Sequence, residues 1–276
     1  MVDKKKIWAY VTYLKKFKEI SKAVQMIAIA KLRKLNTRIE SREFALSFAV
    51  ALFDDVDNDT ECRRVTVVVL TSERSCCGRL NSEVLSAARD TIDLYLRDYK
   101  LVRIISIGWR GRANSVYKYK AELCKSVTRV GQVSFPSAYV VSLCVLDTTF
   151  DKCLVVFSKY YKIFEQVAAV YEFSPYTLFT NAIYTNRGNN FFYDSLVAYS
   201  TKQLRKLYNY HVCLVILDAF DENTYSESGC RAYPMEMAHK NANGLIKEQM
   251  LVYNKARQEG ITTELLEVVS GAIHTV

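Results

Sequence analysis

The first fifty residues constrain the fold most strongly, because residues 7–53 contain neither Gly nor Pro. A helical pattern of this length is about four times the mean helix length, so it predicts a coiled coil or a long exposed helix. The acidic stretch at residues 54–59 is the first break. Apolar residues recur in steps of three and four, the spacing of one helix face, in two runs: Leu14, Phe17, Ile20, Val24 and Ile27, then Leu32, Leu35 and Ile39.

The C-terminal end has a matching pattern. Pro234 is expected in the first turn of this helix or at a kink, since proline cannot donate to the helix ladder. Two long helices at opposite ends of one chain are expected to pair as an antiparallel coiled coil, with Met26, Ala28 and Ala30 in its seam. The C-terminal seam steps by four and three, as heptads do, with one slip of five: Ala238, Ala242, Leu245, Gln249, Val252, Ala256, then Ile261, Leu265, Val268 and Ala272.

The middle of the chain has a different periodicity. Residues 63–72 form a continuous β-branched run typical of a strand buried on both faces. A helical pattern at 80–99 and a second strand at 101–108 follow, which indicates an α/β unit with a right-handed crossover. Further strands are predicted at 125–133, 152–160 and 166–173, and further helices at 137–146 and 190–217.

The predicted fold class is therefore α/β, with an antiparallel coiled coil of long terminal helices and a central α/β domain. Residues 1–60 and 223–276 form the coiled coil. Residues 61–222 form the central domain, with a mostly parallel, Rossmann-like sheet.

Charge is distributed very unevenly. The chain has a formal net charge of +9, and residues 1–40 hold eleven Lys or Arg against three Asp or Glu. Such a basic block can meet nucleic acid, anionic lipid or an acidic protein surface, or can be a solvated helix face. No apolar run approaches the roughly 18 residues needed to span a bilayer, so no membrane-spanning segment is expected.

The eight cysteines include no C-x-x-C pair, which argues against a zinc ribbon or a thioredoxin-like site. With no secretory signal, a reducing compartment is expected. The basic start resembles a mitochondrial presequence, but its periodicity continues past residue 30, so we interpret it as part of the working protein. Four cysteines lie in apolar stretches and are expected to be core residues: Cys124, Cys144, Cys153 and Cys213.

The sequence offers little catalytic machinery. No Gly is followed by Lys, so a G-K-[ST] phosphate loop is excluded, and neither a nucleophile elbow nor H-E-x-x-H occurs. The G-W-R-G-R at 108–112 has only two glycines and is a weak phosphate-loop signal. His211, His239 and His274 have no acid–base partners nearby in sequence. We expect no catalytic, cofactor-binding or metal-ligating residues.

The segment TSERSCCGRLNSE at 71–83 has two interpretations. Vicinal Cys76 and Cys77 near arginines could form a thiolate pair of lowered pKa. Alternatively, the segment is a strand-to-helix turn with Asn81 or Ser82 as helix N-cap, which we favour.

Four separated blocks resemble one known family. MEMAHKNANGLIKEQMLVYNKARQEGITTELLEVVSGA at 235–272 is similar to the C-terminal signature of the gamma subunit of the F-type rotary ATP synthase. ISKAVQMIAIAKLRKLN at 20–36 resembles that family's K-I-T-K-A-M-x-M-V-A-A-x-K, and TSERSCCGRLN resembles S-D-x-G-L-C-G-x-x-N. DKCLVVFSKYYKIF at 151–164 resembles D-x-V-x-L-V-Y-N-K-F. Val24, Ser75, Cys76 and Pro234 depart from the family pattern, and residues 175–210 match it poorly.

The resemblance implies a non-catalytic rotor shaft, needing no cofactor, that couples rotation of the membrane ring to ATP synthesis or hydrolysis. Its coiled coil would penetrate a ring of three alpha and three beta subunits. The α/β domain would join the membrane rotor ring through small central-stalk subunits. Residues of about 175–210 would lie near that ring.

The resemblance also implies which residues meet partners. A basic first helix, including Lys22 and Lys31, would be attracted to an acidic lever loop of the beta subunits. By the same resemblance, further contacts to the alpha and beta subunits fall on Arg231, Arg257, Gln258, Thr262 and Glu264.

Two other functions remain open from the residues. One is an α/β nucleotide-binding protein or enzyme, and the other is a basic coiled-coil nucleic-acid binder. Under the family interpretation we expect no nucleic-acid partner. A pI near 9.0 and many Cys and Tyr favour the matrix side of the mitochondrial inner membrane, with the cytoplasmic face of a bacterial membrane as alternative.

Overall fold

The computed structural model describes residues 4–51, 62–98, 100–112, 119, 121–131, 133–162, 165–185 and 195–274. The predicted break at 54–59 lies outside these ranges. The chain divides into two compact units: a helix-pair unit, Met1–Ala28 with Ala232–Val276, and a sheet unit, Ile29–Arg231. Helices α1 (Lys4–Ala51) and α7 (Thr201–His274) contribute residues to both.

The sheet unit contains a five-stranded sheet in the order β3-β2-β1-β4-β5. Strands β1 to β4 run parallel, and β5 pairs with β4 antiparallel. The mostly parallel, Rossmann-like sheet is therefore confirmed. The strands are β1 (Arg64–Leu70), β2 (Leu101–Ile107), β3 (Leu123–Val127), β4 (Lys152–Lys162) and β5 (Glu165–Phe173). Strand β3 is shorter than the predicted 125–133 and begins earlier.

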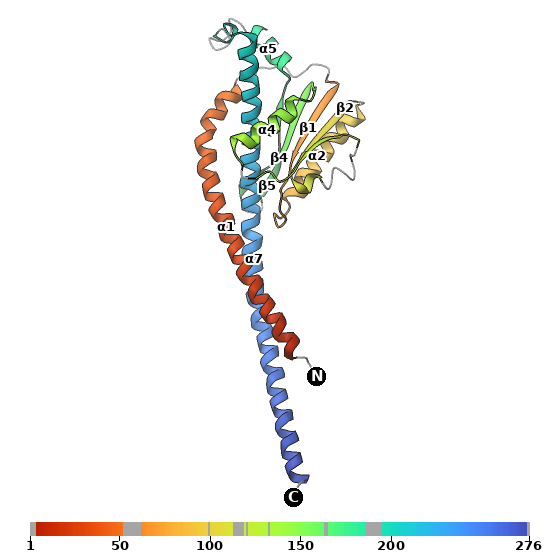
Figure 1. Ribbon diagram of the computed structural model, residues 1–276, viewed down its shortest axis with the longest axis vertical. Helices are drawn as coiled ribbons and strands as arrows, with labels where there is room; N and C mark the ends of the chain where they lie inside the picture. The colour runs from red at the N-terminus through yellow and green to blue at the C-terminus, as the bar shows by residue number, and fades with distance from the viewer. Residues whose placement is uncertain are drawn as a thin grey trace. The chain divides into compact units, whose positions relative to one another are not determined.

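Helices cover both faces of this sheet (Figure 1). Helix α2 (Leu80–Arg97) covers one face, where Val67 of β1 packs. Helix α4 (Phe135–Leu146) covers the other, where Val68 of β1 packs together with α5 (Tyr176–Thr185) and the first part of α7. Because successive residues of a strand point to opposite faces, a doubly covered β1 needs apolar residues almost throughout. This explains its continuous β-branched run.

One carboxylate ties β1 to the start of β4. Asp151 accepts hydrogen bonds from the backbone N–H groups of Arg63 and Arg64, and it pairs with the Arg64 guanidinium at 2.7 Å. The hydrogen bond from that guanidinium is the main cause that holds the pKa of Asp151 below its ordinary 3.8.

The helix-pair unit is an antiparallel pair. Lys18 of α1 donates to Asn243 of α7 at 2.7 Å, whereas Ile7 and Val11, earlier in α1, pack with Ala256, later in α7. Both chain ends lie at the same end of this unit, and α7 continues past the start of α1 (Figure 1). The predicted antiparallel coiled coil is confirmed.

The buried line on α1 differs from the predicted one. Phe17, Ile20 and Ile27 are 39 %, 62 % and 61 % exposed, so the predicted apolar face of the helix is not the buried one at these positions. Met26 and Ala30 are also exposed, whereas Ala28 is buried as expected. The structure places in the seam a set with heptad spacing: Ile7, Val11, Leu14, Ser21, Ala28 and Leu35. The small residues Ser21 and Ala28 escaped a pattern based on large apolar side chains.

Helix α7 also departs from expectation. The two helices predicted at 190–217 and from about 235 are one helix beginning at Thr201; residues 190–194 lie outside the described ranges. Pro234 is therefore inside a helix rather than in its first turn. Ala242 and Ala256 are buried as predicted, but other seam positions are exposed: Leu245, Val252, Ile261, Leu265 and Val268.

The two seam assignments can be separated by mutation. Leu14→Ala should lower the free energy of unfolding by about 2–5 kcal/mol, because it leaves a cavity at a buried position. Ile20→Ala should change it by less than about 0.5 kcal/mol, because that side chain is exposed. Denaturant titrations followed by circular dichroism measure both. Equal losses would contradict the structural register.

Asp151 should contribute a pH-dependent part of stability. Because folding lowers its pKa, its stabilisation is complete above the ordinary value and is lost as pH falls through the lowered one. Asp151→Asn should therefore reduce stability at neutral pH and flatten the fall in unfolding free energy below about pH 4. Asp90→Asn, at an exposed position of α2, is the control. If both variants show the wild-type acid profile, the Asp151 contacts contribute nothing.

Candidate functional site

The described residues offer no clear catalytic or metal centre. They contain no group of three or more His, Cys, Asp or Glu that could hold a metal ion. His211 is 3 % exposed within α7, and His239 Nδ1 lies 3.1 Å from the Lys18 carbonyl of the helix pair. The side chain of His274 is outside the described part. In that same part no helix is long and apolar enough to cross a bilayer.

The surface of the helix-pair unit carries an apolar stripe on α1. We call Tyr13, Phe17, Ile20 and Ile27 the outer stripe; their exposed fractions run from 39 % to 62 %. Spacings of four, three and seven place them on one face of the helix. Lys16 lies exposed beside them, whereas Lys15 and Lys22 lie exposed on the opposite side of the helix. A row of large apolar side chains in water is typical of a protein–protein contact surface.

The end of α7 is exposed in the same way. Gly260 is buried and approached by the Lys4 side chain at the start of α1. Beyond it no other described helix of this unit covers α7. We call this end the terminal segment; its exposed apolar residues are Ile261, Leu265, Leu266, Val268 and Val269.

Four of the predicted contact residues lie beside the terminal segment. Arg257, Gln258, Thr262 and Glu264 are all exposed on α7. The Thr262 hydroxyl donates to the Gln258 carbonyl at 3.0 Å, so these two lie on one face at i and i+4. Arg257 and Glu264 share another face at i and i+7. Lys22 is exposed on α1.

Arg231 and Lys31 lie in the sheet unit. The Arg231 side chain is only 12 % exposed and is paired with Glu227, and it donates to the Cys77 sulfur at 3.0 Å. Its guanidinium is thus engaged within the unit. Lys31 is exposed on α1.

The segment after β1 is the strand-to-helix turn that we favoured, but the N-cap of α2 is a different residue from those predicted. Cys76 and Gly78 adopt positive φ angles of 66° and 56°. Cys76, which departs from the family pattern, therefore has a backbone conformation that non-glycine residues rarely adopt. Arg79, not Asn81 or Ser82, is the N-cap of α2. Asn81 instead accepts the Ser72 N–H at 2.9 Å and holds the turn closed.

The cysteines behave mainly as packing residues. Burial raises the pKa of Cys77 and raises that of Cys230 to about 11, which opposes a reactive thiolate pair at Cys76 and Cys77. Cys153 and Cys213 are buried as predicted and Cys144 is half-buried. Cys124 is exposed, so its assignment to the core was wrong.

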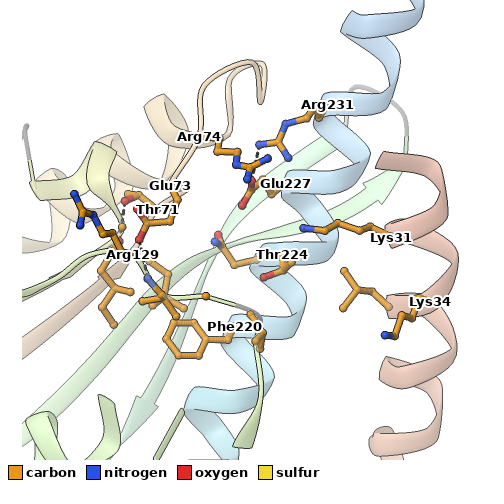
Figure 2. Close-up of a pocket in the computed structure, with 18 of the residues that line it drawn as sticks. Lys31, Lys34, Thr71, Glu73, Arg74, Arg129, Phe220, Thr224, Glu227 and Arg231 are labelled. Carbon is orange, nitrogen blue, oxygen red and sulfur yellow. Dashed lines mark hydrogen bonds and ion pairs between the residues drawn. The ribbon is translucent and has the colours of Figure 1, made fainter. Parts of the chain in front are cut away.

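A pocket of about 880 Å³ lies in the sheet unit (Figure 2). Its walls come from α1, α7 and the loops that follow β1, β2 and β3. No local sequence pattern predicts this basic pocket, because its cations come from segments far apart in the chain. They are Lys31, Lys34, Arg38, Arg74, Arg129 and Arg231.

Comparison with known proteins gives these surfaces a context. The ATP synthase family profile matches residues 4–273. The ATP synthase gamma chain of Methylobacterium nodulans is 30 % identical, with 95 % of this chain and 96 % of that protein covered. The chain belongs to the ATP synthase gamma-chain family. The gamma chain of Beijerinckia indica is 29 % identical, again with 95 % of this chain and 96 % of that protein covered.

Solved structures of ATP synthases share the fold. A chain of the Euglena gracilis mitochondrial ATP synthase (OSCP/F1/c-ring) matches with a TM-score of 0.75 at 21 % identity, covering 99 % of this chain and 94 % of that one. A chain of the Tetrahymena thermophila mitochondrial ATP synthase central stalk and c-ring matches with a TM-score of 0.64 at 20 % identity. This match covers 79 % of this chain and 99 % of that one. Membership of this gamma-chain family makes the helix-pair surface, rather than a catalytic cleft, the candidate site.

Thiol labelling tests the assignment of the cysteines. With iodoacetamide at about pH 8, Cys76 and Cys124 should react quickly because they are exposed. Cys230 should resist, since a thiol of pKa about 11 is roughly 0.1 % thiolate at that pH. Cys77 and Cys153 should also resist because they are buried. Peptide mass spectrometry gives the rates. Labelling of Cys77 as fast as Cys76 would restore the reactive-pair interpretation.

Proposed function

We propose that this chain is the central rotor shaft of an F-type proton-translocating ATP synthase. In this role it performs no chemistry itself and couples rotation of a membrane ring to ATP synthesis or hydrolysis in alpha and beta subunits. The observation that carries the proposal is the match to gamma chains over nearly the whole length of both proteins.

The two exposed apolar surfaces support this role. The outer stripe and the terminal segment place large side chains in water, at fractions up to 70 % for Val268. Apolar patches of this kind are normally covered by a partner. In the proposed assembly, three alpha and three beta subunits surround the helix pair and cover both surfaces.

The helix pair also meets the physical requirement of coupling. A partner can shift the equilibrium of a catalytic site only if it contacts the conformations of that site differently. Two helices of different sequence present a different face in each direction, so one shaft within a ring of three equivalent sites contacts each site differently. Rotation then takes each site through the same series of conformations in turn.

The contact residues of the shaft remain a proposal. Arg257, Gln258, Thr262 and Glu264 are assigned to contacts with the ring, and Lys22 and Lys31 to attraction toward acidic loops of beta subunits. Arg231 is assigned to a lower contact of the shaft with the same acidic loops of the beta subunits. Because its guanidinium is engaged with Glu227 and Cys77, it would act there by holding the turn after β1 in place.

The sheet unit is assigned to the base of the rotor. There it would join the membrane ring through small central-stalk subunits. We place the complex at the mitochondrial inner membrane with the shaft on the matrix side, on the basis of the basic composition; the bacterial relatives keep the cytoplasmic face of a bacterial membrane as the alternative. Fractionation of the source cells, with this chain detected by antibody, distinguishes the two locations.

Native mass spectrometry tests the assembly. The complex that copurifies with this chain should contain one copy beside three alpha and three beta subunits and should hydrolyse ATP. Recovery of the chain alone, or with nucleic acid and no ATPase subunits, would contradict the proposal.

A pair of substitutions tests the contact residues. Arg257→Ala should lower the ATP hydrolysis rate of the reconstituted complex by roughly three- to tenfold, equivalent to about 1 kcal/mol of lost contact. Lys255→Ala removes the same charge at an exposed position two residues away and should leave the rate within about twofold. Equal effects would show that the contact at Arg257 is not specific.

A further inference from the structure

The shaft function explains only part of the basic pocket of the sheet unit, because Lys31 and Arg231 are the only two of its cations that are assigned to partner contacts. It is bounded on several sides by α1, α7 and the loops after β1, β2 and β3, so it is a hollow rather than a flat charged face. Its volume of about 880 Å³ lies within the roughly 300–1,000 Å³ of small-molecule sites. A pocket of this size fits a small ligand better than a protein segment.

The position of the pocket in the fold also points to a ligand. Leu70 and Ile107 are the last residues of β1 and β2, Arg129 lies two residues after the end of β3, and all three line the pocket. In open α/β sheets, ligands bind outside the carboxyl ends of parallel strands. In the order β3-β2-β1-β4, the pocket lies at the ends of the first three strands and the loops that follow them.

The charge of the pocket indicates the chemical class of its ligand. Six cationic side chains and two carboxylates line it, a formal charge of +4. Arg38 forms an ion pair with Asp221 at 3.1 Å, and Arg231 forms one with Glu227. Within the described part of the chain, no ion pair is found for the remaining four: Lys31, Lys34, Arg74 and Arg129. Like charges gathered in a hollow repel one another, and a bound polyanion relieves that repulsion.

The rest of the lining is apolar. Phe220 projects from α7, and Lys31 extends from α1 toward α7 (Figure 2). Leu70, Ile107 and Phe220 are at most 5 % exposed and form an apolar wall. A ligand that matches both parts carries several negative charges and an apolar, planar group. A nucleoside polyphosphate has this combination.

We propose that the basic pocket binds a nucleoside polyphosphate. Lys34 and Arg74 neutralise its phosphates, and its base packs against the wall that includes Phe220. Because the chain has no G-K-[ST] loop, side-chain cations rather than a nest of backbone N–H groups hold the phosphates. The proposal goes beyond the shaft function, and the chain alone suffices to test it.

The test is calorimetric titration of the purified full chain with ATP in about 0.15 M salt, where long-range attraction is screened. One saturable site is expected. Lys34→Ala with Arg74→Ala should weaken ATP binding by at least about tenfold, because two charged contacts are lost. Lys202→Ala with Lys206→Ala removes equal charge at exposed positions of α7 outside the pocket and should leave affinity within about twofold.

A second variant blocks the pocket without changing its charge. A Cβ atom added at Gly131 meets no atom within 4 Å, and Gly131 lines the pocket. Gly131→Trp should therefore fold and should abolish ATP binding by filling the space. Circular dichroism confirms folding of each variant.

Four outcomes would overturn the proposal. They are the absence of a saturable site, equal weakening by both double variants, unchanged ATP binding in Gly131→Trp, and a competitor that binds at least as tightly as ATP. The competitors are pyrophosphate and decaglutamate. Pyrophosphate binding as tightly as ATP would remove the role of the base, and tighter binding of decaglutamate would assign the pocket to an acidic protein segment.

Discussion

Close packing of the first and last helices is the constraint on which the function of this protein depends. At Ser21 and Ala28 of α1, and at Ala242, Ala256 and Gly260 of α7, small residues fill the seam and let the two backbones approach. Large apolar residues of α1 are thereby left outside the seam, in the outer stripe. An ordinary coiled coil buries such residues between its own helices; this helix pair leaves them exposed.

In the sheet unit, α7 packs with polar as well as apolar groups. Asn223 accepts the buried Ser158 N–H at 3.2 Å, and the Ser226 and Ser158 hydroxyls lie 2.7 Å apart. Asp221, whose side chain is fully buried, pairs with Arg38 of α1. A buried carboxylate requires such a partner, since an unpaired charge inside a protein is strongly destabilising. The same geometry brings the cations of α1 to the edge of the sheet, where the basic pocket lies.

Much of the architecture could be predicted from periodicity. The run at 63–72 correctly predicted β1, because a strand covered on both faces has few positions for polar residues. The long pattern without Gly or Pro correctly predicted α1. The seam assignment failed at Leu245, and the apolar face that contains Phe17 and Ile20 is exposed, since spacing alone cannot distinguish exposed apolar side chains of a helix from buried ones. Asn81 was misassigned because its amide bonds the preceding turn instead of capping α2.

The sequence by itself determined the order of elements and the resemblance to gamma chains, because periodicity and local motifs are properties of neighbouring residues. Tertiary structure alone decided which helix faces are buried and where Arg231 points. It also assembled the basic pocket, whose cations are distributed from Lys31 to Arg231. Burial and charge clustering arise from contacts between segments distant in sequence, and no local pattern records those contacts.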